Sequence, residues 1–99
     1  MTDFADIINE DLRLVLLRLL SEAPQYLANS SVLHKGAGMM GFHASRDQVN
    51  SQLDWMGENG LVKIEAVGPV KVATLTGRGL DVAEGTIKAT GVARPSPRA

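Results

Sequence analysis

The sequence has no cysteine, few aromatic residues and almost no net charge. Without cysteine, the chain has no disulfide, no thiolate ligand for a metal ion and no thiol nucleophile. A net charge of −1 argues against both a strongly basic nucleic-acid-binding chain and an acidic disordered chain. Long apolar runs are also missing, since the longest is Leu14–Leu17 and a membrane span needs ~20 residues. We therefore expect no membrane partner.

The composition that is present predicts one ordinary globular domain. The 99 residues are 44% hydrophobic and 21% charged, which fits a single domain near the small end of the usual range. A chain this short has a thin core, which oligomerisation could supplement. Its first residues, MTDFADIINED, are acidic where a secretory signal peptide would be basic, so we expect a cytoplasmic protein.

A first helix is predicted between the N-terminus and Pro24. Thr2 or Asp3 can cap its first turn. Apolar residues recur at three- and four-residue spacing and predict an inward stripe of Phe4, Ile7, Ile8, Leu12, Val15, Leu16, Leu19 and Leu20. Leu14 and Leu17 fall outside that stripe, so the C-terminal half of the helix is apolar nearly all round. We expect a homodimer that forms through this helix.

A short second helix is predicted to begin after Asn29 or Ser30 and to end near Met40. Its expected inward side chains are Val32, Leu33, Ala37 and Met40. The glycines around its end weaken the helix by about 1 kcal/mol each relative to alanine.

The third helix is the best defined of all. Ser45 can cap it, and Gln48, three residues on, completes a capping-box pattern. Gly60 is suited to end the helix in the left-handed conformation. The side chains expected to face the core are Val49, Leu53 and Met56.

Two strand-like runs follow the third helix, at residues 61–67 and 70–75, and predict a hairpin that turns at Gly68-Pro69. Thr76 is expected to begin a last short helix that ends at Gly85. These elements predict a mainly α domain over residues 1–85 with a small β-hairpin, in the order helix, helix, helix, hairpin, helix. Residues 86–99 are basic, contain two prolines and have little to bury, so we expect a disordered tail there.

The chain resembles the winged helix-turn-helix superfamily, most closely its ArsR- and MarR-type regulators, in the stretches SRDQVNSQLDWMGENGLVKI and LTGRGLDVA. Its start, DFADIINEDLRLVLLRLL, and its RPSP tail also resemble small winged-helix proteins of Mu-like prophages. The resemblance implies a winged helix-turn-helix fold, duplex DNA as the partner and a role in phage or prophage transcription regulation. ArsR-like sensors often bind metals through cysteine, so metal sensing is not carried over to this chain.

The resemblance also implies where DNA would be bound. In such domains the third helix enters the major groove and the hairpin lies along the DNA backbone. Arginine can pair with guanine, and asparagine or glutamine with adenine. The side chains suited to reading bases are therefore Arg46, Gln48, Asn50 and Gln52. Those suited to phosphate contacts are Lys35, Ser45, Ser51, Lys63 and Lys71.

A second interpretation stays open, because the third helix also carries Asp47, Asp54 and Glu58, which would repel phosphate. Under that interpretation the domain is a protein-interaction module in phage assembly or in a host complex and binds no DNA. His34 and His43 have no clustered carboxylates beside them, so we expect no metal site. We also expect no cofactor, and no spacing of residues marks a catalytic set, so we do not expect an enzyme.

Overall fold

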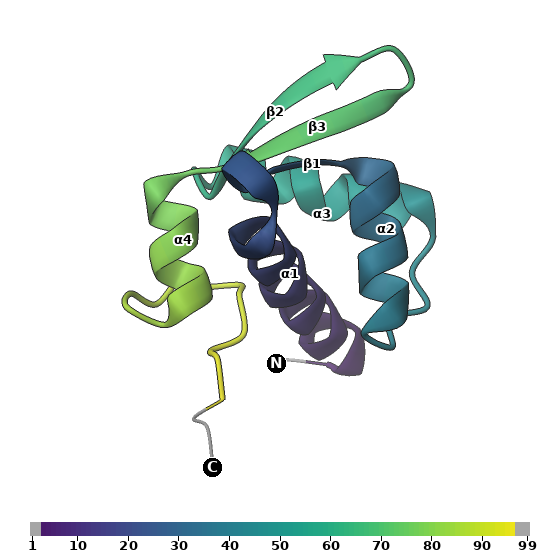
Figure 1. The fold of residues 1–99 in the computed structure, drawn as a ribbon. Helices are drawn as coiled ribbons and strands as arrows, with labels where there is room; N and C mark the ends of the chain where they lie inside the picture. The colour runs from purple at the N-terminus through teal and green to yellow at the C-terminus, as the bar shows by residue number, and fades with distance from the viewer. Residues whose placement is uncertain (1–2, 97–99) are drawn as a thin grey trace.

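The structure, a computed structural model, describes residues 3–96. It combines four α-helices with a small antiparallel sheet (Figure 1). The elements in chain order are α1 (Phe4–Glu22), the short 3-10 helix η1 (Pro24–Tyr26), β1 (Leu27–Asn29), α2 (Ser30–Met39), α3 (Arg46–Glu58), β2 (Val62–Val67), β3 (Val70–Leu75) and α4 (Gly77–Glu84). No helix within the described residues is both long enough and apolar enough to cross a membrane.

Hydrogen bonds at the helix N-termini confirm four predicted caps. At α1, the Asp3 carboxylate accepts from the backbone N–H of Asp6 at 2.9 Å. At α2, the Asn29 side chain accepts from the backbone N–H of Val32 at 2.8 Å. At α3, the Ser45 hydroxyl accepts from the N–H of Gln48, and the Gln48 side chain accepts in return from the N–H of Ser45. At α4, the Thr76 hydroxyl accepts from a backbone N–H three residues on. Each cap satisfies N–H groups that have no partner inside the helix.

The sheet has three strands in the order β1-β3-β2, so the prediction of a hairpin alone is wrong. The hairpin itself is present, with β2 and β3 joined at Gly68, whose φ of 59° suits glycine. The extra strand, β1, pairs with β3 from Leu27 opposite Thr74 to Asn29 opposite Val72. Three residues are too few to show strand alternation, and β1 exists because the free edge of β3 offers it a partner.

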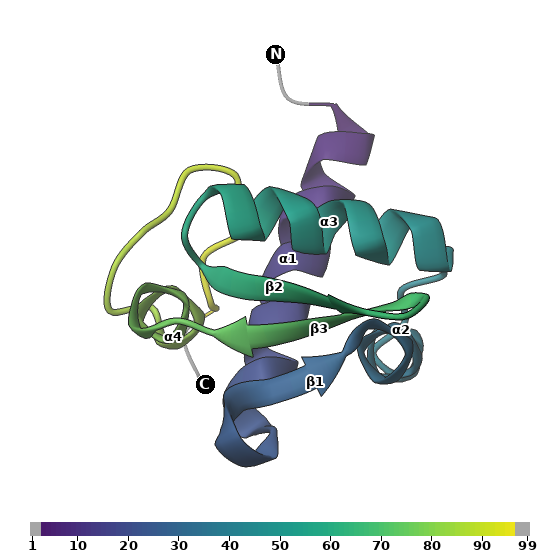
Figure 2. The same ribbon diagram turned by 90° about the horizontal axis from the view of Figure 1, so that it is seen from above.

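Helix α1 crosses the middle of the molecule, with α2 and α4 on either side of it (Figure 1). Its C-terminal half is covered on several sides, and the buried leucines there include Leu14 and Leu17. The first turns extend past α3, and Phe4, Ile7 and Ile8 are exposed (Figure 2). The predicted inward stripe is therefore wrong at its N-terminal end, whereas Leu12, Leu16 and Leu20 are buried as predicted. Leu14 and Leu17, which prompted the homodimer prediction, lie in the core of the chain itself.

Helix α2 buries Leu33 and Ala37 as predicted, but Val32 and Met40 are exposed, so that part of the expected stripe is wrong. The helix lies close to α1 at Gly36, where an added Cβ would stand 2.9 Å from the Leu19 side chain. This close approach limits how many side chains of α2 can pack against α1.

The segment that follows α4 packs on the domain, which corrects the expected boundary at residue 85. Ala89 and Val92 are buried, and the backbone N–H of Ala93 donates to the carbonyl of Glu10 at 3.2 Å. Small apolar residues fill the space available there, although their spacing forms no helical or strand pattern. Residues 97–99 of the expected tail lie outside the described part of the chain.

Candidate functional site

The candidate site is the outer surface of α3 together with the hairpin that runs beside it (Figure 2). Val49, Leu53 and Met56 are fully buried, as predicted, and fix the inward face of α3. Because a helix turns once in 3.6 residues, the opposite face is set by the same spacing. The structure thereby determines which of the predicted DNA-binding side chains are available to a partner.

The most exposed ridge of α3 is acidic. Asp47, Ser51, Asp54 and Glu58 follow one another at spacings of four, three and four residues, and all four are exposed. Residues at this spacing share one helix face. The ridge that points most directly away from the core therefore carries three carboxylates and one hydroxyl group.

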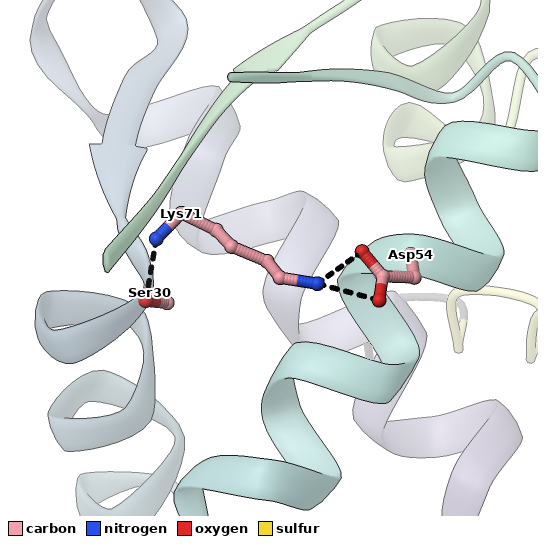
Figure 3. A network of polar contacts seen from close by, with 3 residues as sticks. All are labelled: Ser30, Asp54 and Lys71. Carbon is pink, nitrogen blue, oxygen red and sulfur yellow. Dashed lines mark hydrogen bonds and ion pairs between the residues drawn. The ribbon is translucent and has the colours of Figure 1, made fainter. Parts of the chain in front are cut away.

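One of those carboxylates is paired across to the hairpin (Figure 3). Lys71 donates from Nζ to both carboxylate oxygens of Asp54 at 2.5 Å, and its backbone N–H donates to the Ser30 hydroxyl at 3.2 Å. Both side chains remain partly exposed, so the ion pair contributes only about 0–1 kcal/mol to stability. The pair offsets the charge of Asp54, and it engages the ammonium group that we expected to contact phosphate.

Gln52 does not belong to the candidate surface, which corrects the prediction that it reads a base. Its side chain is buried, and Oε1 accepts from Arg13 Nε at 2.6 Å. The guanidinium of Arg13 also lies over the Trp55 ring, 4.0 Å from its centroid, and donates from Nη1 to the carbonyl of Gly91. Positions 49, 52, 53 and 56 share the helical core spacing, and that pattern could have identified Gln52 as inward.

Arg13 ties α1, α3 and the C-terminal segment together. Burial lowers the pKa of the Arg13 guanidinium from its ordinary value, while the nearby carboxylates of Glu10 and Asp6 act in the raising direction. A partly buried cation still needs hydrogen-bond partners, and Gln52 and Gly91 supply them. This cluster is a structural clamp, and it lies away from the exposed ridge of α3.

Two further predicted base-reading side chains are only partly available to a partner. Gln48 is exposed, but its Oε1 is used in the α3 cap, and the residue lines a groove with Ile8 and Phe42 on the α1 side. Asn50 is partly buried, and its amide oxygen has no hydrogen-bond partner among the described residues. By helical spacing, Gln48 and Asn50 lie on opposite sides of the acidic ridge of α3.

The remaining predicted contacts are open to a partner. Arg46 and Ser51 on α3, Lys63 on β2 and Lys35 on α2 are exposed. Ser45 is also exposed, although its hydroxyl serves the helix cap.

The two histidines do not form a metal site with other residues. His34 Nε2 lies 2.8 Å from the carbonyl of Ala44, which holds α2 against the turn before α3. His43 is exposed in that turn. Across residues 3–96, no three histidine, aspartate or glutamate side chains gather as a set of metal ligands.

Comparison with known proteins gives two similar sequences. The uncharacterized protein gp26 of Escherichia phage Mu is 47% identical over 94 residues, which cover 95% of this chain and 97% of that protein. An uncharacterized protein of Haemophilus influenzae is 44% identical over 78 residues, or 78% of this chain and 76% of that protein. No family model and no solved structure matches. The chain therefore belongs to the same protein family as gp26 of phage Mu.

Proposed function

We propose that the chain is a winged helix-turn-helix domain that binds duplex DNA and acts as a phage or prophage transcriptional regulator. The observation that carries the proposal is an exposed helix, α3, lying beside the β2–β3 hairpin, with a free arginine at its N-terminal end and an exposed lysine in the hairpin. Domains that read DNA with a helix and a hairpin use this combination, and residues at the start of the helix contact base edges. The similarity to a phage Mu protein supports the phage context.

The arrangement of charge supports modest affinity. Lys35, Arg46 and Lys63 are the exposed basic side chains suited to phosphate contact, while Lys71 is held by Asp54. Three phosphate contacts correspond to a log–log salt slope of about −3, and a homodimer with two such surfaces to about −5. Arg46, with Asn50 and Ser51 beside it on α3, would carry the base contacts.

Fluorescence anisotropy against random-sequence duplex DNA, at low salt and near physiological salt, tests this proposal. We expect Arg46→Ala and Lys63→Ala each to weaken binding and to reduce the salt slope by about 1. Arg18→Ala is the matched control, since Arg18 is an exposed arginine of α1 outside the proposed surface. If Arg46→Ala and Lys63→Ala bound DNA as tightly as Arg18→Ala, α3 and the hairpin would not be the DNA-binding surface.

A second candidate function is favoured by the acidic ridge of α3. The carboxylates of Asp47, Asp54 and Glu58 suit a basic protein surface better than a phosphate backbone. In that case the domain would be a protein-interaction module in phage assembly or in a host complex.

The double variant Asp47→Asn/Glu58→Gln separates the two candidates. If α3 approaches DNA, removing two repulsive charges should strengthen DNA binding and steepen its salt slope. If neither the natural chain nor this variant binds duplex DNA at low salt, the protein-interaction function is favoured.

A further inference from the structure

A second exposed surface lies at the N-terminal end of α1. Phe4, Ile7 and Ile8 are 74%, 47% and 40% exposed, and their spacing places them along one side of the helix. The first turns of α1 extend beyond α3, so the chain itself does not cover them (Figure 2). Clustered exposed side chains of this size mark interaction sites more often than isolated ones do.

Further exposed apolar side chains lie at the C-terminal end of α2. Met39 is 87% exposed and Met40 is 61% exposed. Met40 lines a separate surface hollow beside the second half of α1, where the apolar Val15 and Leu19 alternate with the charged Arg18 and Glu22. Methionine side chains are unbranched and flexible, and they adapt well to the shape of a partner.

Between α1 and the turn that precedes α3 lies an apolar groove of about 410 Å³. Its lining includes Ile8, Leu12, Phe42 and Ala44, with polar groups at its edge from His43 and Gln48. The volume falls within the ~300–1,000 Å³ of typical ligand pockets. The groove can therefore receive apolar side chains from a partner that also covers the exposed turns of α1.

The charges around this surface indicate what kind of partner fits. The first half of α1 carries Asp3, Asp6, Glu10 and Asp11, and residues 3–12 contain no lysine or arginine. Asp11 is exposed on the same side of the helix as Ile8, three residues away. A second copy that met this end of α1 with its own would bring these carboxylates together, which costs energy. A partner with basic groups around an apolar stripe would instead complement them.

We propose that this surface, formed by the first half of α1 and the groove between α1 and the turn that precedes α3, binds an amphipathic helix of another protein. That helix has apolar side chains at three- and four-residue spacing and lysine or arginine along its edges, a common way for a helix to occupy an apolar groove. The exposed turns of α1 and the hairpin lie at opposite ends of the molecule (Figure 1), while the groove reaches Gln48 at the start of α3.

The test uses a labelled synthetic peptide of about five helical turns, with leucine at helical spacing and lysine elsewhere, titrated with the full chain by fluorescence anisotropy. Two control peptides replace every lysine with glutamate, or keep the composition and scatter the leucines. We expect saturable one-to-one binding of the first peptide alone. Equal binding of the glutamate peptide would overturn the charge argument, and equal binding of the scattered peptide would show non-specific attraction in place of the proposed site.

Variants of the chain locate the site. Phe4→Ser/Ile8→Ser should weaken binding of the lysine peptide about tenfold or more, since it removes two apolar contacts. Asp11→Asn should weaken it about two- to fivefold, as loss of one exposed charge pair does. Val32→Ser/Val67→Ser is the matched control, because these valines are equally exposed elsewhere, and it should bind normally.

Sedimentation of the same proteins tests whether a second copy of the chain occupies this surface. A chain that sediments as a monomer agrees with the proposal. A dimer that Phe4→Ser/Ile8→Ser converts to a monomer would overturn it, because the surface would then be a homodimer contact. The proposal would also be overturned if Val32→Ser/Val67→Ser lost as much peptide binding as Phe4→Ser/Ile8→Ser does.

Discussion

Replacing Gly79 with alanine should destabilise the domain, although alanine is the better helix former. Gly79 lies in the first turn of α4, where that turn passes close to the end of α3 and the start of β2. A Cβ at this position would stand 2.0 Å from the carbonyl oxygen of Leu61 and 2.7 Å from the side chain of Leu75. Atoms at these separations overlap, so the backbone has to move.

The Leu61 carbonyl cannot move without further loss. It accepts from the Thr76 backbone N–H at 3.1 Å and from the Thr76 hydroxyl at 2.9 Å. Overpacking costs about 1–3 kcal/mol, and each weakened hydrogen bond adds about 1 kcal/mol. The gain in helix propensity offsets about 1 kcal/mol. We expect Gly79→Ala to lower the free energy of unfolding by about 2–4 kcal/mol, or the Tm by roughly 10–30 °C.

Urea unfolding followed by circular dichroism measures this effect, and Gly77→Ala provides the matched control. Gly77 belongs to the same turn of α4, and a Cβ there would meet no atom within 4 Å. Alanine at position 77 should therefore leave the free energy of unfolding unchanged or raise it by up to ~1 kcal/mol. If Gly79→Ala were as stable as Gly77→Ala, the close packing of α4 on Leu61 would be refuted.

Four further substitutions, at three positions, test other contacts. Thr76→Val removes the α4 cap and should cost about 1–2 kcal/mol in urea unfolding, and an unchanged midpoint would contradict the role of that cap. Arg13→Ala leaves buried acceptors unpaired and should cost about 2–3 kcal/mol, with faster tryptic cleavage of the segment after α4. Arg13→Lys should restore little of this loss, because lysine lacks the planar guanidinium, and full restoration would argue against the clamp. Asp54→Asn should cost at most ~1 kcal/mol at low salt and nothing at high salt, so a larger loss would show that the ion pair is more than a surface contact.

The features predicted correctly depend on residues close together in the chain. The caps at Asp3, Ser45 and Thr76 each need one side chain and an N–H three residues on. The spacing of Val49, Leu53 and Met56 is enough to define the inward face of α3. Hydrogen bonds and helical periodicity of this kind operate within four residues, and a sequence displays them directly.

The features that were missed depend on contacts between distant residues. Gln52 is a polar residue on a core face, and only Arg13, 39 positions earlier, makes its burial favourable. Strand β1 forms because β3, more than 40 residues later, offers an edge. The pairing of Lys71, a predicted phosphate contact, with Asp54 likewise joins residues that are 17 positions apart. No local pattern contains the partner in any of these cases.

The sequence alone determined the order of the helices and the hairpin, the caps and the inward face of α3, because neighbouring residues supply the hydrogen bonds and the periodicity. The tertiary structure determined which apolar groups α1 exposes, the pairing of Asp54 with Lys71 and the packing of the segment after α4. An apolar helix can bury any of its sides, and the elements that fold against it choose which side remains free. For α1 those elements cover Leu14 and Leu17 and leave Phe4, Ile7 and Ile8 exposed.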